Sequence, residues 1–137
     1  MLRVIGCITD EHSPGMLILA LLVCMAGCAT ACVMMTRGNL ATQTAHRRAW
    51  LLGAGAIFGS GAWATHFVAM LAFRPLFPIS YEIVTTVLSL VVACLGCAAA
   101  VSCRTVLGRW GNAAAGAGLG LTVWVMHNMG ISAMEVE

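Results

Sequence analysis

Two histidines stand in segments of the sequence that carry no charged residue. His127 follows His66 by 61 positions, and a tryptophan precedes each by three positions, at Trp63 and Trp124. The same offset matches three further pairs: Gly55 with Gly116, Gly59 with Gly120, and Ala72 with Ala133. Since tryptophan and histidine are rare in apolar segments, the matches indicate a duplicated unit. An imidazole in apolar surroundings is unfavourable without a partner, so the two histidines form a candidate functional site.

Methionines accompany both histidines. Met70 follows His66 by four positions, which places a thioether and an imidazole on one face of a helix. Met126 directly precedes His127, and Met134 follows it by seven positions, again on the histidine face of a helix. Thioether and imidazole donors together suit copper better than magnesium, calcium or manganese. We therefore predict a copper site formed by His66, Met70 and His127 and completed by Met126, Met134 or His12.

The elements that must position these residues follow from the distribution of charge. Charged residues are absent from residues 12–36, 49–73, 83–103 and 110–134, each 21 to 25 residues long. About 20 apolar residues in a helix cross ~30 Å of hydrocarbon, so each segment can cross once. The alternating pattern of a membrane barrel strand is absent. The sequence predicts an all-α integral membrane fold of four transmembrane helices, built from a duplicated two-helix unit.

The composition supports a membrane protein and excludes other classes. Of the 137 residues, 61% are hydrophobic and 9% charged, whereas soluble domains have roughly 25% charged residues. The net charge is +2 and no basic run occurs, which excludes a nucleic-acid partner. The seven cysteines are odd in number and lie mostly within apolar segments, which argues against a disulfide framework. The lipid bilayer is the partner that this composition requires.

The arginines predict the orientation. Residues 37–48 contain three arginines and residues 104–109 contain two, whereas residues 74–82 contain one arginine and one glutamate. Positively charged connections favour the cytoplasmic side. We therefore expect a multi-pass protein with both termini outside the cytoplasm. His66 and His127 then lie about 10 Å below the outer ends of their helices.

Two segments resemble the signature motifs of the MHYT domain, a bacterial integral membrane sensor module. Residues 59–73, GSGAWATHFVAMLAF, resemble the first motif, and residues 124–134, WVMHNMGISAM, resemble the second. Tyr81 and the pair Ser89-Leu90 also fit the family, so the resemblance covers nearly the whole chain. It implies a bacterial inner membrane location, a copper site near the outer face, and sensing of dioxygen, carbon monoxide or nitric oxide. It also implies coupling to cytoplasmic GGDEF and EAL domains, which make and break cyclic di-GMP.

The second motif departs from the family pattern. Asn128 replaces the signature tyrosine, Met129 stands where threonine is usual, and Ile131 replaces the methionine expected four positions after the histidine. The predicted copper pocket is therefore asymmetric. Residues 1–137 are interpreted as a partial MHYT-like sensor domain, either a fragment or a degenerate short member, because a third motif and an output domain are absent from them. A signal would then need a separate partner.

We expect a sensor or metal-binding module rather than an enzyme. The sequence contains no phosphate loop, no paired zinc motif and no nucleophile with an accompanying base. Two alternatives stay open. Histidines at equal depth on two helices could ligate a haem in a membrane electron carrier. The chain could instead be a ligand-free structural membrane fragment in which the histidines only bridge helices.

Overall fold

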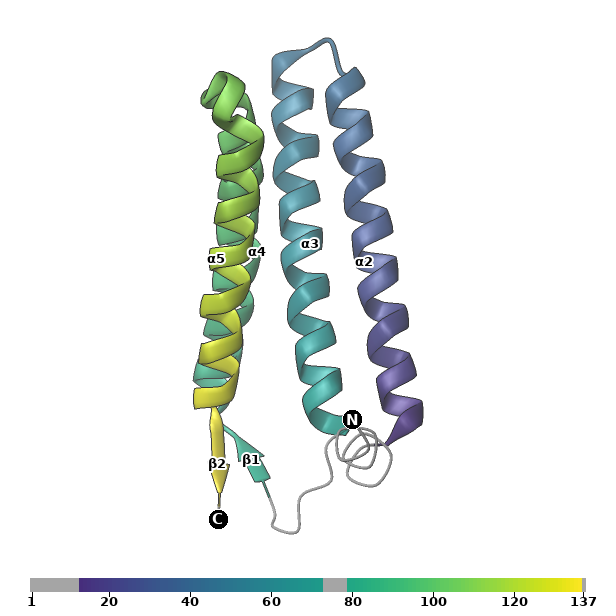
Figure 1. Ribbon diagram of the computed structural model, residues 1–137, viewed down its shortest axis with the longest axis vertical. Coiled ribbons are helices and arrows are strands. Elements are labelled where there is room, and N and C mark those ends of the chain that lie inside the picture. The colour runs from purple at the N-terminus through teal and green to yellow at the C-terminus, as the bar shows by residue number, and fades with distance from the viewer. Residues whose placement is uncertain (1–12, 73–78, 137) are drawn as a thin grey trace, which may run out of the picture.

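The computed structural model describes residues 13–72 and 79–136, which form four long helices and a short two-stranded ribbon (Figure 1). The helices are α2 (Pro14–Leu40), α3 (Thr44–Ala72), α4 (Ile83–Val106) and α5 (Gly111–Ser132), with a short 3₁₀ helix, η1 (Gly108–Trp110), before α5. The strands β1 (Ile79–Tyr81) and β2 (Met134–Val136) pair in antiparallel fashion. Apart from this ribbon, the predicted all-α fold with four helices is confirmed.

Three of the helices are long and apolar enough to cross a membrane, namely α2, α3 and α4. α5 has 22 residues and is therefore about 33 Å long, but several glycines together with His127 and Asn128 make it less apolar. It lies lengthwise beside α4 in Figure 1. α5 thus has the length and the place of a fourth span.

The two helix hairpins close with equivalent contacts. The backbone nitrogen of Ser13 donates to the carbonyl oxygen of Ala72 at 2.8 Å, which joins the start of α2 to the end of α3. The nitrogen of Glu82 donates to the carbonyl oxygen of Ala133 at 2.9 Å, which joins the start of α4 to the end of α5. Ala72 and Ala133 are both fully buried, and they are one of the pairs matched at the 61-residue offset. The duplication predicted from the sequence therefore has a structural counterpart.

Two glycines of α3 allow this helix to pack closely against α4. A Cβ atom on Gly55 would collide with the backbone of Ala98, and one on Gly59 would collide with the backbone of Ala93. This pair of small residues therefore allows the two backbones to approach closely. The matching pair on α5, Gly116 and Gly120, has no atom within 4 Å of such a Cβ among the described residues. The first pair therefore lies in a close helix contact, whereas the second faces open space in the described structure.

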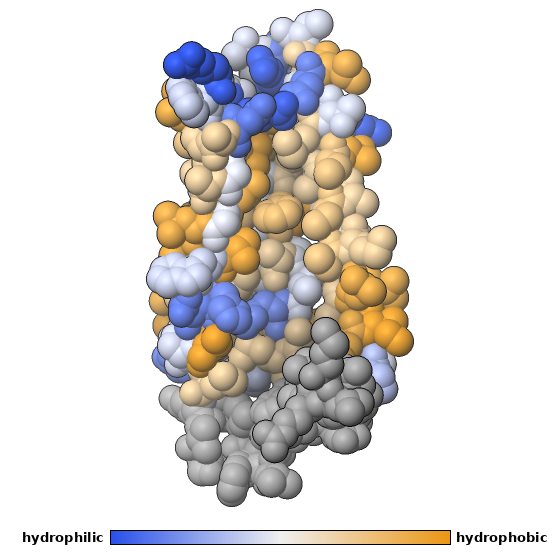
Figure 2. All heavy atoms as spheres, in the orientation of Figure 1, coloured by the Kyte–Doolittle hydropathy of each residue, from blue (hydrophilic) through white to orange (hydrophobic). Residues whose placement is uncertain are grey.

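The two ends of the bundle differ in character. The connections between α2 and α3 and between α4 and α5 lie at one end, and the strands lie at the other (Figure 1). Figure 2 shows hydrophilic residues at the connection end, a largely apolar flank, and a second hydrophilic patch nearer the strands. Ile18, Leu22 and Leu95 are more than half exposed, as expected for side chains that face lipid.

Candidate functional site

His66 of α3 and His127 of α5 face each other. Their Nδ1 atoms are 3.2 Å apart, and their rings meet edge to face with centroids 4.7 Å apart and an interplanar angle of 69°. α3 and α5 run in the same direction, so positions matched by the repeat reach the same level of the bundle. In a hydrogen bond between the two nitrogens one donates and the other accepts, so the accepting nitrogen directs a lone pair at its partner.

The histidine pair lines an open cavity of about 480 Å³ between α2, α3 and α5, here called the histidine cavity. Ala62, Thr65 and His66 of α3 contribute one wall. The opposite wall contains the residues 61 positions later, which are Val123, Met126 and His127 of α5. Gly120 and Trp124 of α5 and Cys24 of α2 complete the lining. Equivalent positions of the two repeats therefore build one site.

The ring of His66 is held by packing. The backbone of Gly130 lies so close that a Cβ atom there would collide with Nε2 and Cδ2 of His66, and the ring of Phe67 packs edge to face with centroids 5.3 Å apart. Nε2 of His66 is buried and has no hydrogen-bond partner among the described residues. An unpaired buried polar group costs roughly 1–3 kcal/mol. Packing, rather than a second hydrogen bond, therefore keeps Nδ1 directed at His127.

A row of aromatic side chains ties the site to α4 and to β1. The indole nitrogen of Trp63 donates to the hydroxyl of Ser89 at 3.0 Å, and the Ser89 hydroxyl donates to the carbonyl oxygen of Thr86 at 2.7 Å. Phe67 lies 4.7 Å from Trp63 and 6.0 Å from Tyr81, measured between ring centroids. Ser89 is fully buried, so this hydrogen-bonded contact anchors the site helix in the interior.

The structure brings some of the predicted ligands to the histidine cavity and leaves others elsewhere. Met126 lines the cavity and is 1% exposed. Met70 lies one helical turn beyond His66, and among the described residues neither Met70 nor Met134 lines the cavity. His12 lies outside the described residues.

The expectation that Met134 lies on the histidine face of a helix is wrong. α5 ends at Ser132, and Met134 begins β2. The carbonyl oxygen of Ala133 accepts a hydrogen bond from the nitrogen of Glu82, and Met134 pairs with Tyr81 across the ribbon. These contacts with the start of α4 end the helix before the methionine.

The spacing of the two histidine nitrogens matches that of two ligands of one metal ion, but the other features of a metal site are incomplete in the described residues. Two ligand nitrogens at ~2.0 Å from one tetrahedral ion are about 3.3 Å apart, close to the observed 3.2 Å between the Nδ1 atoms. Met126 adds a thioether, which favours copper. Among the described residues, no group of three or more His, Cys, Asp and Glu side chains could hold a metal. Nε2 of His66 also lacks the oxygen partner that a metal-binding histidine usually has.

Gly130 and Cys24 belong to the site, although the repeat matches neither of them. Gly130 follows His127 by three positions and therefore lies on the same helix face. This spacing is the one feature of the sequence that could have indicated its place in the site. Cys24 reaches the cavity through the packing of α2 against α3, and no pattern in the sequence reports that contact.

A family model described as the bacterial signalling protein N-terminal repeat, MHYT, matches residues 59–117. The match contains His66 and ends before His127. No solved structure matches the chain.

Three curated relatives match most of the chain. An uncharacterized signaling protein of Caulobacter vibrioides is 38% identical over 136 residues, which are 98% of this chain and 17% of that protein. The cyclic di-GMP phosphodiesterase NbdA of Pseudomonas aeruginosa is 38% identical over 128 residues, 90% of this chain and 16% of the relative. The bifunctional diguanylate cyclase/cyclic di-GMP phosphodiesterase MucR of the same organism is 36% identical over 118 residues, which are 84% of this chain and 17% of that protein. The chain spans about one sixth of the length of these relatives.

Proposed function

Because the chain carries the MHYT repeat of bacterial signalling proteins, we propose that it is a membrane sensor module whose His66–His127 pair binds copper. The observation that carries the proposal is the 3.2 Å approach of the two Nδ1 atoms, one from each repeat. His66 and His127 would hold the ion, with Met126 as the thioether donor and Met70, Met134 or His12 as further candidates. Copper held there would supply a coordination position that dioxygen, carbon monoxide or nitric oxide can take.

The walls of the histidine cavity suit a small apolar ligand. Ala62 and Val123 present apolar side chains, and the described residues of the lining include no charged one. His127 is exposed whereas His66 is half-buried, so access to the pair is from the side of α5. An apolar gas dissolves in the surrounding hydrocarbon and can enter there, while a charged oxidant is excluded by the cost of leaving water.

A haem bound between the two histidines is less compatible with this geometry. The rings are in contact, with centroids 4.7 Å apart, which leaves no space for a porphyrin between them. A membrane electron carrier would require α3 and α5 to separate.

We further propose that the arginine-rich end faces the cytoplasm of a bacterial cell and that the histidine cavity lies near the outer leaflet, with both termini outside. The arginine distribution supports this orientation. An impermeant thiol reagent applied from outside should label Cys7 and leave Cys103 unlabelled. Labelling at position 103 from outside alone would reverse the orientation.

The proposed output is the synthesis or breakdown of cyclic di-GMP by GGDEF- or EAL-type domains on a separate or further segment. The names of two relatives, which concern cyclic di-GMP turnover, support this proposal. The relatives match over about one sixth of their length, so we assign no catalysis to residues 1–137 themselves.

Competition against a Cu(I) chelator, with protein purified in detergent, tests the copper site. His66→Ala and His127→Ala should each abolish copper retention, and the control His46→Ala should retain it, because His46 lies outside the histidine cavity. Addition of carbon monoxide to the copper-loaded protein should give an infrared C–O band that His127→Ala loses. Equal copper affinities in all four proteins would instead favour a ligand-free structural bundle, and a Soret band in the purified protein would favour haem.

A further inference from the structure

The connection end of the bundle holds positive charge without a carboxylate to balance it. Five arginines belong to this end, in the last turn of α2, the first turns of α3, the last turn of α4 and η1: Arg37, Arg47, Arg48, Arg104 and Arg109. Residues 12–81 contain no aspartate or glutamate. Of the acidic residues that the structure describes, Glu82 and Glu135 belong to the opposite end, at the start of α4 and in β2. Counter-charge at this end must therefore come from outside the described chain.

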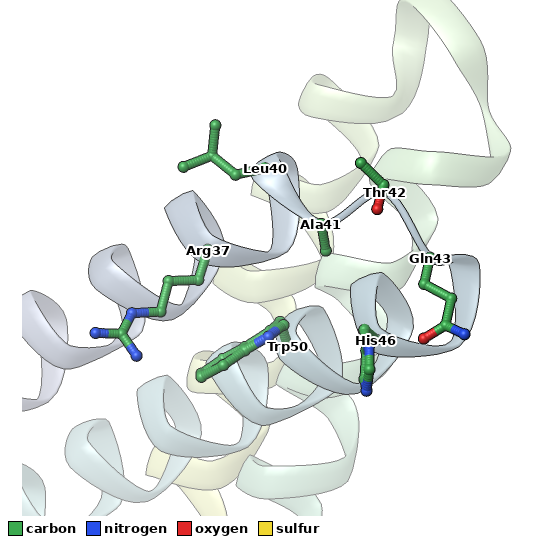
Figure 3. A pocket seen from close by; sticks show the side chains of 7 residues that line it. All are labelled: Arg37, Leu40, Ala41, Thr42, Gln43, His46 and Trp50. Atoms are coloured by element: carbon green, nitrogen blue, oxygen red, sulfur yellow. The ribbon is translucent and has the colours of Figure 1, made fainter.

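A cavity of about 770 Å³, here called the arginine cavity, opens at the connection between α2 and α3 (Figure 3). Arg37, Thr42, Gln43, His46 and Trp50 line it. The guanidinium carbon of Arg37 lies 5.5 Å from the centre of the Trp50 ring, and Figure 3 shows this ring between Arg37 and His46. Arg37 is thus stacked on an aromatic side chain that also lines the cavity.

The arginine cavity has polar side chains that can donate hydrogen bonds beside the apolar Leu40 and Ala41. Guanidinium, imidazole, indole, amide and hydroxyl groups can all donate hydrogen bonds, and no carboxylate is among the lining residues. A guanidinium binds phosphate oxygens in a bidentate manner, which a point charge cannot reproduce. A phosphate group therefore matches this set of donors.

An apolar track leads away from the cavity. Val33, Arg37 and Leu40 are spaced by four and three positions, so they share one face of α2. Val33 is 53% exposed and Leu40 is 77% exposed. Trp50 is a residue type that is enriched where lipid headgroups meet hydrocarbon. A ligand that places its phosphate at Arg37 can lay a hydrocarbon chain along this face.

We propose that the arginine cavity binds the headgroup phosphate of an anionic phospholipid, with an acyl chain along the Val33 face of α2. Arg37 binds the phosphate, and Trp50 holds the guanidinium in place. His46 and Gln43, on the other side of the Trp50 ring, donate to the headgroup hydroxyls. Basic pockets at the ends of membrane helices recognise lipid headgroups by this chemistry. The site is independent of the histidine cavity, which lies toward the strand end.

The second connection offers a matched control. The guanidinium carbon of Arg109 lies 5.3 Å from the centre of the Trp110 ring. Arg109 carries the same charge and the same aromatic contact at the same end of the bundle, but it does not line the arginine cavity. A bound lipid should therefore distinguish Arg37 from Arg109, whereas diffuse attraction to a charged surface should not.

Native mass spectrometry of the full chain in detergent, titrated with dioleoyl-phosphatidylglycerol or dioleoyl-phosphatidylcholine, tests the proposal. The wild type should retain phosphatidylglycerol in preference to phosphatidylcholine. Arg37→Gln should lower the apparent affinity for phosphatidylglycerol roughly tenfold, as expected for a lost charge-assisted bidentate contact. Arg37→Lys should cause a smaller loss because it keeps the charge, and Arg109→Gln should change the affinity less than about threefold.

Three results would overturn the proposal. Equal losses in Arg37→Gln and Arg109→Gln would mean that the protein responds to surface charge rather than to a site. Equal retention of both lipids would mean that the headgroup charge is not recognised. Displacement of phosphatidylglycerol by millimolar inorganic phosphate would identify a site for small anions instead. Circular dichroism of each variant should match the wild type, since the substituted side chains are exposed.

Discussion

α3 and α5 carry the same repeated pattern of glycine, tryptophan and histidine, yet their surroundings differ. α3 packs along both α2 and α4, whereas α5 packs along α4 and touches α3 only in part. Trp63 is hydrogen-bonded to buried Ser89, while its counterpart Trp124 is 62% exposed. His66 is half-buried, while His127 is exposed. A duplicated motif has therefore acquired two roles, a fixed half on α3 and an accessible half on α5.

This difference bears on how the histidine pair can respond to a ligand. Phe67 of the same helix packs against the His66 ring, and His66 is half-buried whereas His127 is exposed, so a change at the site is expected to move the His127 ring rather than the His66 ring. α5 is open at Gly116 and Gly120 in the described structure, although its Gly111 and Gly118 lie close to Arg104 and Ala100 of α4. The side chain that moves when the site changes is thus predicted to be that of His127.

The largest contrast between the repeats should appear in the glycine pairs. Gly55→Leu forces a side chain into the backbone of Cys97 and Ala98 and should destabilise the bundle by about 3 kcal/mol or more. The matched variant Gly116→Leu has open space and should change stability by less than about 0.5 kcal/mol. Unfolding by a denaturing detergent measures both. An equally large effect at Gly116 would show that its face is covered.

Gly130→Ala should break the His66–His127 contact with a smaller effect on folding. The added methyl group displaces the His66 ring, so copper affinity should fall about 10- to 100-fold, the usual range when support for a ligand is removed. Chelator competition measures this, and Ala69→Gly, at the position 61 residues earlier, is the matched control. Unchanged copper affinity in Gly130→Ala would show that copper binding does not depend on the position of the His66 ring.

The cavity positions Thr65 and Met126 are matched by the repeat and differ in chemistry. Met126→Leu keeps the volume but removes the thioether, so Cu(I) affinity should fall about tenfold. Thr65→Val keeps the shape of the other wall and should leave Cu(I) affinity unchanged. The same chelator competition compares them. Equal affinities of the two variants would remove Met126 from the proposed ligand set.

The smallest effect concerns the tryptophans. Trp63→Phe removes the hydrogen bond to Ser89 and should cost about 1 kcal/mol of stability, in the range measured for such bonds between membrane helices. Trp124→Phe should cost almost nothing, because that side chain is exposed. A double-mutant cycle with Ser89→Ala isolates the Trp63 hydrogen bond. A coupling energy of zero would contradict its role as an anchor.

The sequence by itself determined the number of long helices, the repeat and the level of the two histidines. Helical hydrogen bonds are local, and the absence of charge over 21 to 25 residues sets the length of each apolar segment. The helices α2, α3 and α4 nevertheless extend past these segments to include Arg37, Arg47 and Arg104. Arginines at helix ends can keep their charge in water while their stems cover apolar surface, so charge alone does not end a membrane helix.

Only the tertiary structure decided which face of each helix is buried. α2 and α5 are apolar around most of their circumference, so no polar stripe marks an outer side, and lipid does not distinguish one apolar face from another. Close backbone contact therefore selected Gly55 and Gly59, but not Gly116 and Gly120, for the helix interface. The same packing brought Met126 rather than Met70 into the histidine cavity. It also ended α5 before Met134, because the start of α4 binds the carbonyl oxygen of Ala133.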